Sequence, residues 1–376
     1  MEEKLYWVWL TKIPGLGPRR IKKLVDYFKD AKGIWNAGRE DLNSVKGIGS
    51  STSIKIIESK ARFNFKRELQ QLKKFKVKVV TLSDKCYPKL LKEIYDPPPV
   101  LYYKGDISSL EKPCISIVGS RKCTSYGQRI ANRLGQRLAE IGVSVTSGLA
   151  RGIDTASHQG AVRTGSTVAI LGSGLDNMYP PENRGLAKKI MNNGSLLTPF
   201  SLGTKPQAGN FPVRNRIISG LSLGTIVVEA AQKSGSLITA NLALEQGREV
   251  FAIPGDITKS QSKGTNNLIK SGAKLVQSLE DILDELSFKI NFTSNRPKNN
   301  SQIINEKTLK SLAPQEKQVY QQLSINPQQF ESIVAKLNLN SGQLNSVLLE
   351  LEVKGLVEQL PGRKFKLNKY HKERSI

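Results

Sequence analysis

The sequence predicts an α/β fold built around a mostly parallel β-sheet, and two observations support this prediction. Short apolar runs alternate with segments of helical pattern along the middle of the chain. The apolar runs lie at residues 114–119, 143–148, 166–172, 194–199, 224–230 and 249–255. The helical segments begin near Tyr126, Asp154, Glu182, Arg214, Ser236 and Asn266. The runs are apolar almost throughout, which is typical of strands buried on both faces, so we predict a Rossmann-like sheet.

Size and charge indicate a protein of several domains with an anionic partner. The 376 residues suffice for two or three domains of roughly 100–200 residues each. With 57 Lys and Arg against 32 Asp and Glu, the net charge is +25, which favours nucleic acid or an anionic membrane. The membrane alternative lacks support. No stretch approaches the ~20 apolar residues of a spanning helix, and MEEKLYWVWL lacks the basic start of a signal peptide.

Cysteine and histidine are too scarce for a disulfide framework or a Cys/His zinc site. Cys86, Cys114 and Cys123 are odd in number and indicate a reducing, cytoplasmic environment. His158 and His371 are the only histidines, so we expect no metal centre.

Residues 1–75 are predicted to form a helical domain. The motif IPGLG at residues 13–17 is repeated as VKGIG at residues 45–49, and a helical pattern follows each copy. This arrangement resembles a helix-hairpin-helix, in which the hairpin leaves amide N–H groups at a helix start open to a phosphate. A tight turn that serves only packing would show the same pattern, and both interpretations remain open.

The rest of the chain is divided into three parts. Residues 76–287 are assigned to the α/β domain, whose beginning is stiffened by Pro97–Pro99. Residues 288–310 are polar and rich in Asn, Ser and Lys, and are interpreted as a linker. Residues 311–370 resemble a winged-helix domain, with a final hairpin and short helices at 314–323, 327–337 and 341–354. The third of these helices is poor in basic residues for reading a DNA groove.

The binding site is expected at the carboxyl ends of the strands, where ligands of such sheets bind. Loops rich in Gly, Ser and Arg follow the strands there, at residues 119–127, 147–154, 172–183 and 210–215. The stretch from Asn183 to Val228 contains six Lys and Arg and no Asp or Glu. Such a cationic, Gly-rich stretch suits the phosphates of nucleic acid, because backbone N–H groups can approach them closely.

The cations of this stretch fall into two groups. Arg184, Lys188 and Lys189 lie on a predicted helix and are interpreted as a solvated face. The second group is expected at the strand ends, opposite Arg121 and Arg151, and consists of Lys205, Arg214 and Arg216. Phe211 stands beside these cations, where stacking on a base of a single strand is favoured over bracing of the loop.

Motifs for nucleotide cofactors and for catalysis are weak. GSGLDN has Asn177 in place of the third glycine of GxGxxG, and no GxxxxGK[ST] occurs, so neither a nicotinamide-cofactor enzyme nor a P-loop nucleotidase is expected. Asp154 and His158 lie four residues apart on a predicted helix and could form a catalytic pair. Asp154 opens that helix, however, where capping is the usual role of a carboxylate. Glu229 is expected to bond loop amides rather than act as a general base.

Taken together, these loops closely resemble the DprA/Smf family of bacterial DNA-processing proteins. The resemblance is carried by residues 119–127, 147–158, 169–183, 210–255 and 262–273. It implies a cytoplasmic protein that binds single-stranded DNA through a basic pocket, protects incoming DNA during natural transformation and loads the RecA recombinase onto it. It also implies a homodimer, with no cofactor and no catalytic step.

The resemblance assigns the residues of the DNA pocket as well. They are Gly119, Ser120, Arg121, Ser147, Gly148, Arg151, Lys205, Asn210, Phe211, Arg214, Arg216 and Lys233. One departure from the family is visible, because Thr198-Pro199 stand where the family usually has Ser-Glu. Loss of this acid makes the rim of the pocket more cationic and puts in doubt the local contact that it normally makes.

Two alternative functions come from other classes. The first is a Rossmann-like nucleotide phosphoribohydrolase with a lysine decarboxylase-like fold. Its PGGxGTxxE motif fits poorly, because LSL precedes Gly224 and Glu229 falls one position late. The second is a nuclease, which needs a carboxylate cluster for metal that the basic stretch lacks.

Overall fold

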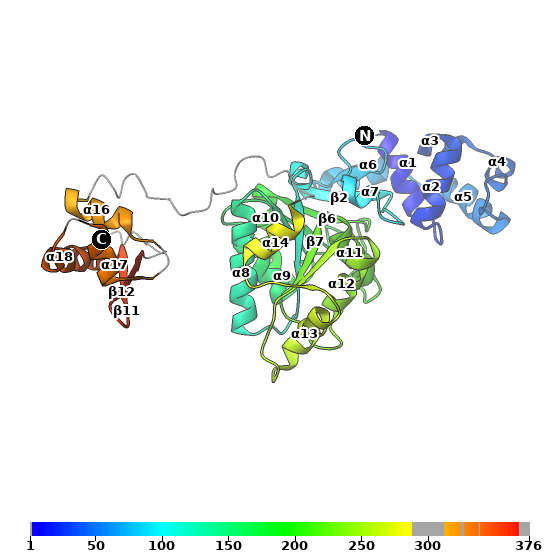
Figure 1. The fold of residues 1–376 in the computed structure, drawn as a ribbon. Helices are drawn as coiled ribbons and strands as arrows, with labels where there is room; N and C mark the ends of the chain where they lie inside the picture. Colours follow the sequence, from blue (N-terminus) through cyan, green and yellow to red (C-terminus); the bar gives the residue numbers. More distant parts are fainter. Residues whose placement is uncertain (1, 288–311, 325–326, 338, 368–376) are drawn as a thin grey trace. The chain divides into compact units, whose positions relative to one another are not determined.

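The computed structural model describes residues 2–287, 312–324, 327–337 and 339–367. The chain forms two compact units, Met1–Phe292 and Thr293–Ile376 (Figure 1). The predicted linker at 288–310 lies outside the described residues. None of the helices that the structure describes is long and apolar enough to cross a bilayer.

Short helices make up the beginning of the first unit. They are α1 (Glu2–Thr11), α2 (Pro18–Phe28), α3 (Ala31–Asn36), α4 (Arg39–Asn43), α5 (Ser50–Arg62) and α6 (Phe65–Lys74). The two glycine motifs form the turns before α2 and α5. Gly15 and Gly47 adopt φ angles of 80° and 93° in these turns, a conformation that glycine reaches without strain. The predicted tandem of helical hairpins is therefore present.

The helical segment does not have a core of its own. One cluster of buried apolar side chains extends from Trp9 of α1 and Ile56 of α5 to Tyr102 and Leu196 of the neighbouring sheet. The Lys4 side chain also donates a hydrogen bond of 3.1 Å to the carbonyl oxygen of Val79 in the sheet. The predicted boundary near residue 75 thus separates helices from strands but does not interrupt the packing.

The sheet of the first unit has the strand order β1-β2-β6-β5-β4-β3-β7-β8-β9. The strands are β1 (Lys78–Thr81), β2 (Val100–Gly105), β3 (Cys114–Val118), β4 (Ser144–Ser147), β5 (Thr167–Ile170), β6 (Ser195–Thr198), β7 (Gly224–Val227), β8 (Glu249–Ala252) and β9 (Lys274–Leu275). Pairing is parallel from β6 to β9, and β1 and β2 form an antiparallel edge. The mostly parallel sheet predicted from the apolar runs is confirmed, with a strand inside each run.

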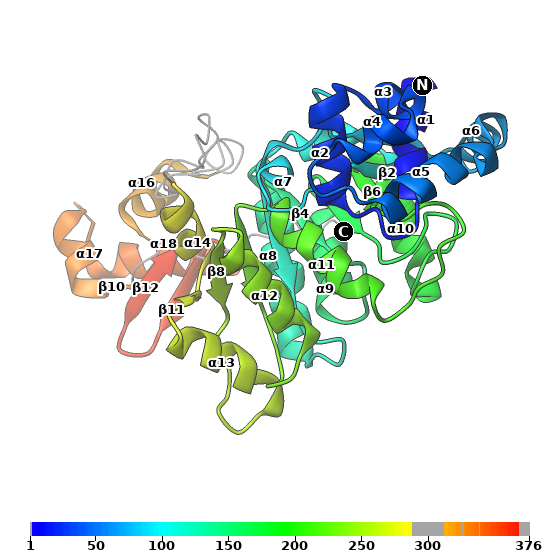
Figure 2. The same cartoon turned by 90° about the vertical axis from the view of Figure 1, so that its right-hand side faces the viewer.

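Helices cover both faces of this sheet, as Figures 1 and 2 show. On one face, α8 (Ser125–Glu140), α9 (Ile153–Ala161) and α14 (Leu279–Leu286) share a buried cluster with β3 and β4. On the other face, α7 (Lys89–Lys92), α11 (Asn210–Gly220) and α12 (Gly235–Glu245) pack on β3, β5 and β7. The remaining helices are α10 (Arg184–Asn193) and α13 (Lys263–Lys270). Burial on both faces explains why the strand sequences do not alternate.

The start of α11 differs from the prediction. Residues 210–215 were expected to form a loop, but the helix begins at Asn210 and includes them. Pro212 suggested a loop in the sequence, yet proline is tolerated in the first turn of a helix, where N–H groups have no partner within the helix. Phe211 and Arg214 therefore project from a rigid helical turn.

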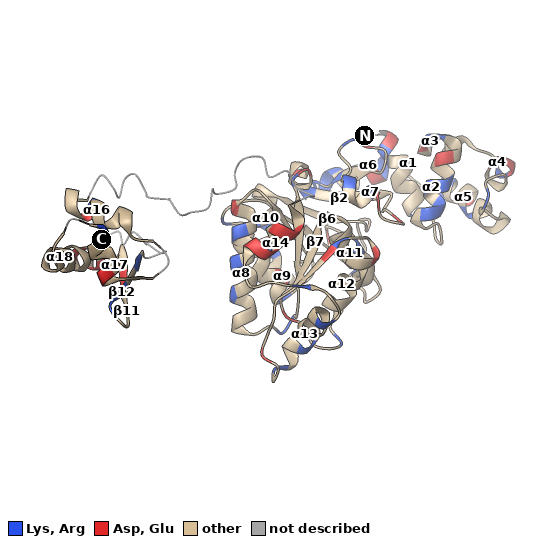
Figure 3. Cartoon of the chain, viewed as in Figure 1, with Lys and Arg blue, Asp and Glu red and all other residues tan. Residues whose placement is uncertain are grey.

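The second unit is a small domain of helices and a three-stranded sheet. It contains α16 (Pro314–Gln322), β10 (Gln328–Gln329), α17 (Phe330–Lys336), α18 (Ser341–Val353), β11 (Val357–Leu360) and β12 (Lys364–Leu367). The sheet order is β10-β12-β11. Val319, Ile333, Leu348 and Phe365 belong to its buried core. This arrangement is the predicted winged helix. Figure 3 shows that basic residues are distributed over both units, so net charge alone does not locate a binding surface.

Candidate nucleic-acid interface

The loop after β3 lies against the loop after β7 and the start of α9. A Cβ at Gly119 would lie 2.6 Å from a side-chain carbon of Ile153 and 2.9 Å from the carbonyl oxygen of Glu229, so only glycine fits there. The Ser120 amide donates to that same carbonyl oxygen at 2.7 Å. These contacts hold the backbone in place and leave Arg121 at the exposed end of the loop.

Arg121 and Phe211 meet although they are far apart in the sequence. The guanidinium carbon of Arg121 lies 5.2 Å from the centroid of the Phe211 ring, within cation–π range. The ring of Tyr179 lies 6.4 Å from that of Phe211. A Cβ at Gly172, after β5, would lie 2.9 Å from the Phe211 ring, so this glycine makes room for it. An exposed cation and a partly exposed aromatic ring therefore stand side by side above the strand ends.

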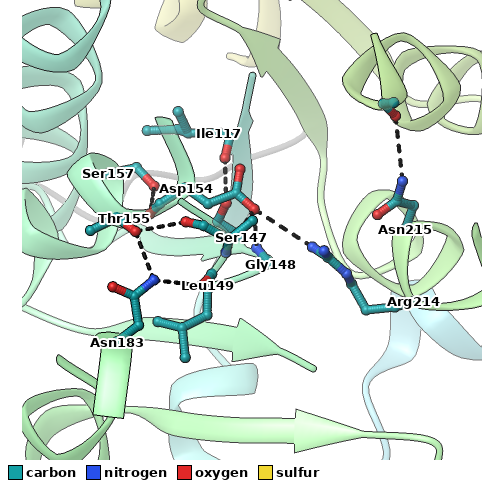
Figure 4. A network of polar contacts seen from close by, with 12 residues as sticks. Ile117, Ser147, Gly148, Leu149, Asp154, Thr155, Ser157, Asn183, Arg214 and Asn215 are labelled. Carbon is teal, nitrogen blue, oxygen red and sulfur yellow. Dashed lines mark hydrogen bonds and ion pairs between the residues drawn. The ribbon is translucent and has the colours of Figure 1, made fainter. Parts of the chain in front are cut away.

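Arg214 does not face this surface as an available cation. Its side chain is 6% exposed, and Nη1 lies 3.6 Å from an Asp154 carboxylate oxygen that is equally buried (Figure 4). A Cβ at Gly148 would lie 1.1 Å from Nη1, so the guanidinium occupies the space that a side chain at 148 would need. The expectation that Arg214 captures phosphate directly is thus corrected, because Arg214 forms a buried ion pair with Asp154.

Asp154 holds the loop that carries Gly148. Its Oδ2 accepts hydrogen bonds from the amides of Gly148 at 3.1 Å and Ala150 at 3.4 Å. Burial raises the pKa of the Asp154 carboxyl, and the Arg214 charge and these amides oppose that rise. The expected capping role is therefore only partly right, since the carboxylate binds amides before the helix and pairs with Arg214.

Two other predicted site residues bind backbone carbonyl oxygens. The Ser147 hydroxyl is buried and donates to the carbonyl oxygen of Ile117 at 2.6 Å. The Asn210 side-chain amide lies 3.1 Å from the carbonyl oxygen of Gly172 and 3.2 Å from that of Lys205, and ties α11 to two loops. Ser147 and Asn210 thus fix backbone positions.

Two of the predicted cationic side chains form ion pairs with acidic residues. Arg151 is exposed but forms an ion pair with Glu182. Arg216 pairs with Asp96 at 2.7 Å, so it leaves α11 in a different direction from Phe211. Lys205 and Lys233 are exposed in loops. Arg121 and Arg214 both lie within cation–π range of the Phe211 ring, at 5.2 and 5.8 Å from its centroid, and Arg121 is the exposed one of the two.

Sequence reasoning missed the role of Asn183. This buried side chain donates to the carbonyl oxygen of Leu149 and to the hydroxyl of Thr155, both at 2.8 Å, and joins the loop after β5 to the start of α9 (Figure 4). Its only signal was its place at the end of a Gly- and Pro-rich loop, which does not reveal these distant partners.

The residues considered for catalysis form hydrogen bonds within the fold. His158 is buried and its Nδ1 lies 2.8 Å from the Thr167 hydroxyl. Burial lowers the pKa of His158 to about 3, so the ring is neutral at physiological pH. Glu229 accepts a hydrogen bond of 2.8 Å from the Thr124 amide before α8, which confirms the expected contact with loop amides.

The chain matches models of known protein families along most of its length. Residues 78–287 match the family described as DNA recombination-mediator protein A, residues 305–363 match the DprA winged helix domain, and residues 10–60 match a SAM-like helix-hairpin-helix tandem. Protein Smf of Synechocystis is 35% identical over 96% of this chain and 98% of its own length. The chain belongs to the DprA/Smf family.

Solved structures of the family are similar to the first unit. DprA of Streptococcus pneumoniae has a TM-score of 0.67 and 37% identity, and the match covers 76% of this chain and 98% of that protein. DNA processing protein A of Helicobacter pylori, studied for its single-stranded DNA binding mode, has a TM-score of 0.52 and 30% identity. That match covers 56% of this chain and 97% of that protein.

At the Thr198-Pro199 departure from the family, Thr198 keeps a side-chain hydroxyl, as the family's Ser has, and this hydroxyl has a structural role. The Thr198 hydroxyl is buried, within 3.0 Å of the carbonyl oxygen of Leu171 and 2.9 Å of that of Ser173. It also accepts a hydrogen bond from the Phe200 amide at 3.2 Å. A hydroxyl therefore bridges the ends of β5 and β6 in this chain.

The hairpins of the helical segment form a separate basic cavity of about 390 Å³. It is lined by Gly15, Gly17, Pro18, Arg19, Arg20, Lys23, Gly47 and Asp96. Asp96 also forms an ion pair with Arg216 of α11, so this cavity lies next to the part of α11 that carries Arg216. Phosphate binding by the hairpins stays a prediction.

Proposed function

We propose that this protein binds single-stranded DNA at the carboxyl ends of β3, β4 and β5. The observation that carries the proposal is the contact between Arg121 and Phe211. Single-strand binding proteins combine a cation for the backbone with an aromatic face for a base, and stacking tolerates every base because each has a π-face. The relative from H. pylori, studied for its single-stranded DNA binding mode, supports the same assignment.

In this proposal, the pocket residues divide into ligands and supports. Arg121 contacts a phosphate, because it is exposed and its guanidinium can form paired hydrogen bonds. Phe211 offers its ring to one base. Arg214 and Asp154 keep the Gly148 loop and the first turn of α11 in register, so they act on DNA only through the shape of the pocket. Few groups are placed to read base edges, so weak sequence preference is expected.

The wider role that we propose is to protect incoming DNA in natural transformation and to load RecA onto it. The family description as a recombination mediator and the similarity to DprA proteins support this role. We further propose a cytoplasmic homodimer that needs no cofactor. Acceleration of RecA assembly on DNA already covered by single-strand binding protein would test RecA loading, and sedimentation would test the dimer.

We also propose that the protein acts without a catalytic step. His158, Asp154 and Glu229 are each engaged in contacts that stabilise the fold, which supports a binding role. Release of base from a nucleoside monophosphate, abolished by Glu229→Ala, would instead establish a phosphoribohydrolase. Magnesium-dependent degradation of DNA that is lost in an Asp154 or Asp176 variant would establish a nuclease.

The decisive experiment compares binding of single-stranded and double-stranded oligonucleotides with the same sequence. We expect preference for the single strand and a loss of at least about tenfold with Arg121→Glu, since a charge reversal removes a phosphate contact and adds repulsion. Lys188→Glu on α10 is the matched control, because it makes the same charge change at an exposed position outside the candidate DNA site. Equal loss in both variants, or preference for the duplex, would contradict the pocket.

A further inference from the structure

The exposed face of α8 carries arginines at regular helical spacing. Arg129 and Arg133 are exposed, and Arg137 follows four residues later. Four residues advance about 6 Å along a helix, so these side chains form one stripe. Figure 3 shows basic residues recurring along α8 and acidic residues on α14. The stripe ends there, because Arg137 lies 3.7 Å from Glu280 of α14.

This stripe begins where the candidate DNA pocket ends. Arg121 lies four residues before α8, and the loop between them is anchored through Thr124 to Glu229. Exposed cations therefore continue from the candidate DNA site onto α8, beginning with Arg129.

A hollow lies beside the first turn of α8. It has a volume of about 430 Å³ and is lined by Tyr126, Pro254, Gly255 and Asp256. Tyr126 is 44% exposed and lies three residues before Arg129, which places both on the same face of the helix. The hollow therefore offers an aromatic surface at the start of the arginine stripe.

The other wall of the hollow is held rigidly. Asn266 accepts a hydrogen bond of 3.2 Å from the Gly255 amide and donates one of 3.0 Å to the Gly255 carbonyl oxygen. Asp256 Oδ1 accepts from the amide and the hydroxyl of Thr258, at 2.9 and 2.8 Å. A carboxylate repels phosphate but accepts hydrogen bonds from base amino groups, so the hollow suits a base better than a phosphate.

We propose that α8 and this hollow form a second contact surface for the same DNA strand. A base of a nucleotide beyond the Arg121–Phe211 pocket stacks on Tyr126, and the phosphates that follow lie along Arg129 and Arg133. This inference rests on the proposed single-strand binding. It extends the contact by about 12 Å, the length of eight residues of helix, which suits a few further nucleotides.

The test measures how the affinity of the full-length protein for oligodeoxycytidylate depends on salt. Strands of about six nucleotides fit the first pocket, and strands of about twenty also reach α8. With the long strand, we expect Arg129→Gln/Arg133→Gln to flatten the slope of log K against log salt by about 1.4, at about 0.7 per phosphate contact. With the short strand, the slope should not change. Lys188→Gln/Lys189→Gln removes the same charge from α10 and should affect neither slope.

Tyr126 provides a second, independent measurement. Tyr126→Ala should weaken binding of the long strand about tenfold and leave the short strand unaffected, whereas Tyr126→Phe should retain affinity because the ring remains. Equal losses on both strands, an unchanged slope, or the same effect in the α10 control would overturn the second surface while leaving the first pocket intact. A loss confined to duplex DNA or to an acidic protein would also overturn it. Failure of the unaltered protein to bind any single strand would refute the proposed function itself.

Discussion

The buried pair of Arg214 and Asp154 gives the most direct test of how the pocket is built. Both side chains are at most 7% exposed, and their charged atoms are 3.6 Å apart. At an effective dielectric constant of about 20, two unit charges at this distance attract by about 4.5 kcal/mol. Removal of one partner of a buried pair typically costs about 3–5 kcal/mol, because the other is left without compensation.

We therefore predict the outcome of a double-mutant cycle. Arg214→Met keeps the length of the side chain and removes its charge, and Asp154→Asn keeps the shape of the acceptor. Each single change should lower the free energy of unfolding by about 3–5 kcal/mol. The double variant should lose little more than one single variant, which gives a coupling energy of about 3 kcal/mol.

Urea unfolding followed by tryptophan fluorescence measures this cycle in the relevant unit alone. The three tryptophans, Trp7, Trp9 and Trp35, all belong to the first unit and to one core. A loss of about 4 kcal/mol should lower the urea midpoint by roughly 1 M. An unchanged midpoint in Arg214→Met, or additive losses in the double variant, would refute the internal pair. Arg214 would then be open to solvent and available to DNA.

Three further predictions concern the same site. Gly148→Ala should destabilise the first unit about as much as Arg214→Met, because its Cβ would lie 1.1 Å from Nη1 of Arg214; Gly185→Ala, which meets no atom within 4 Å, should unfold at or above the normal urea midpoint. Phe211→Ala should weaken single-strand binding by about 1–3 kcal/mol, equally for all base compositions, and Phe211→Tyr should restore it in an anisotropy titration; a base-selective loss would indicate direct readout. His158 takes up its proton in the unfolded chain near pH 6.5 but in the folded protein only near pH 3, so its contribution is present above pH 6.5 and lost as pH falls. From pH 7 to 5.5, stability should fall by about 1.3 kcal/mol more than in His158→Gln, and equal pH dependence of the two proteins would contradict the buried neutral ring.

Much of the fold could be predicted because its signals are local. Continuous apolar runs indicated strands buried on both faces, and the glycines at 15 and 47 indicated turns that require positive φ. The predicted start of α11 was wrong for a local reason as well. Proline is common both in loops and in the first turn of a helix, so Pro212 does not distinguish the two.

The sequence predicted which loops form the candidate site, but not which of their residues face solvent and which support the fold. Arg121 and Arg214 have the same side chain and both follow predicted strands. One is exposed above Phe211, and the other is enclosed by Asp154 and by the space left at Gly148. The partner of Arg216 stands 120 residues away, at Asp96. No spacing rule connects residues that meet only through the order of strands in a sheet.

By itself, the sequence determined the alternation of strands and helices, the positive charge and the motifs that place this chain in its family. The tertiary structure decided which cations remain available to DNA. An arginine can bind DNA directly only when its guanidinium is exposed to solvent and is not paired with a nearby carboxylate. Those neighbours come from distant segments, so the fold assigns exposed Arg121 to the surface and buried Arg214 to its support.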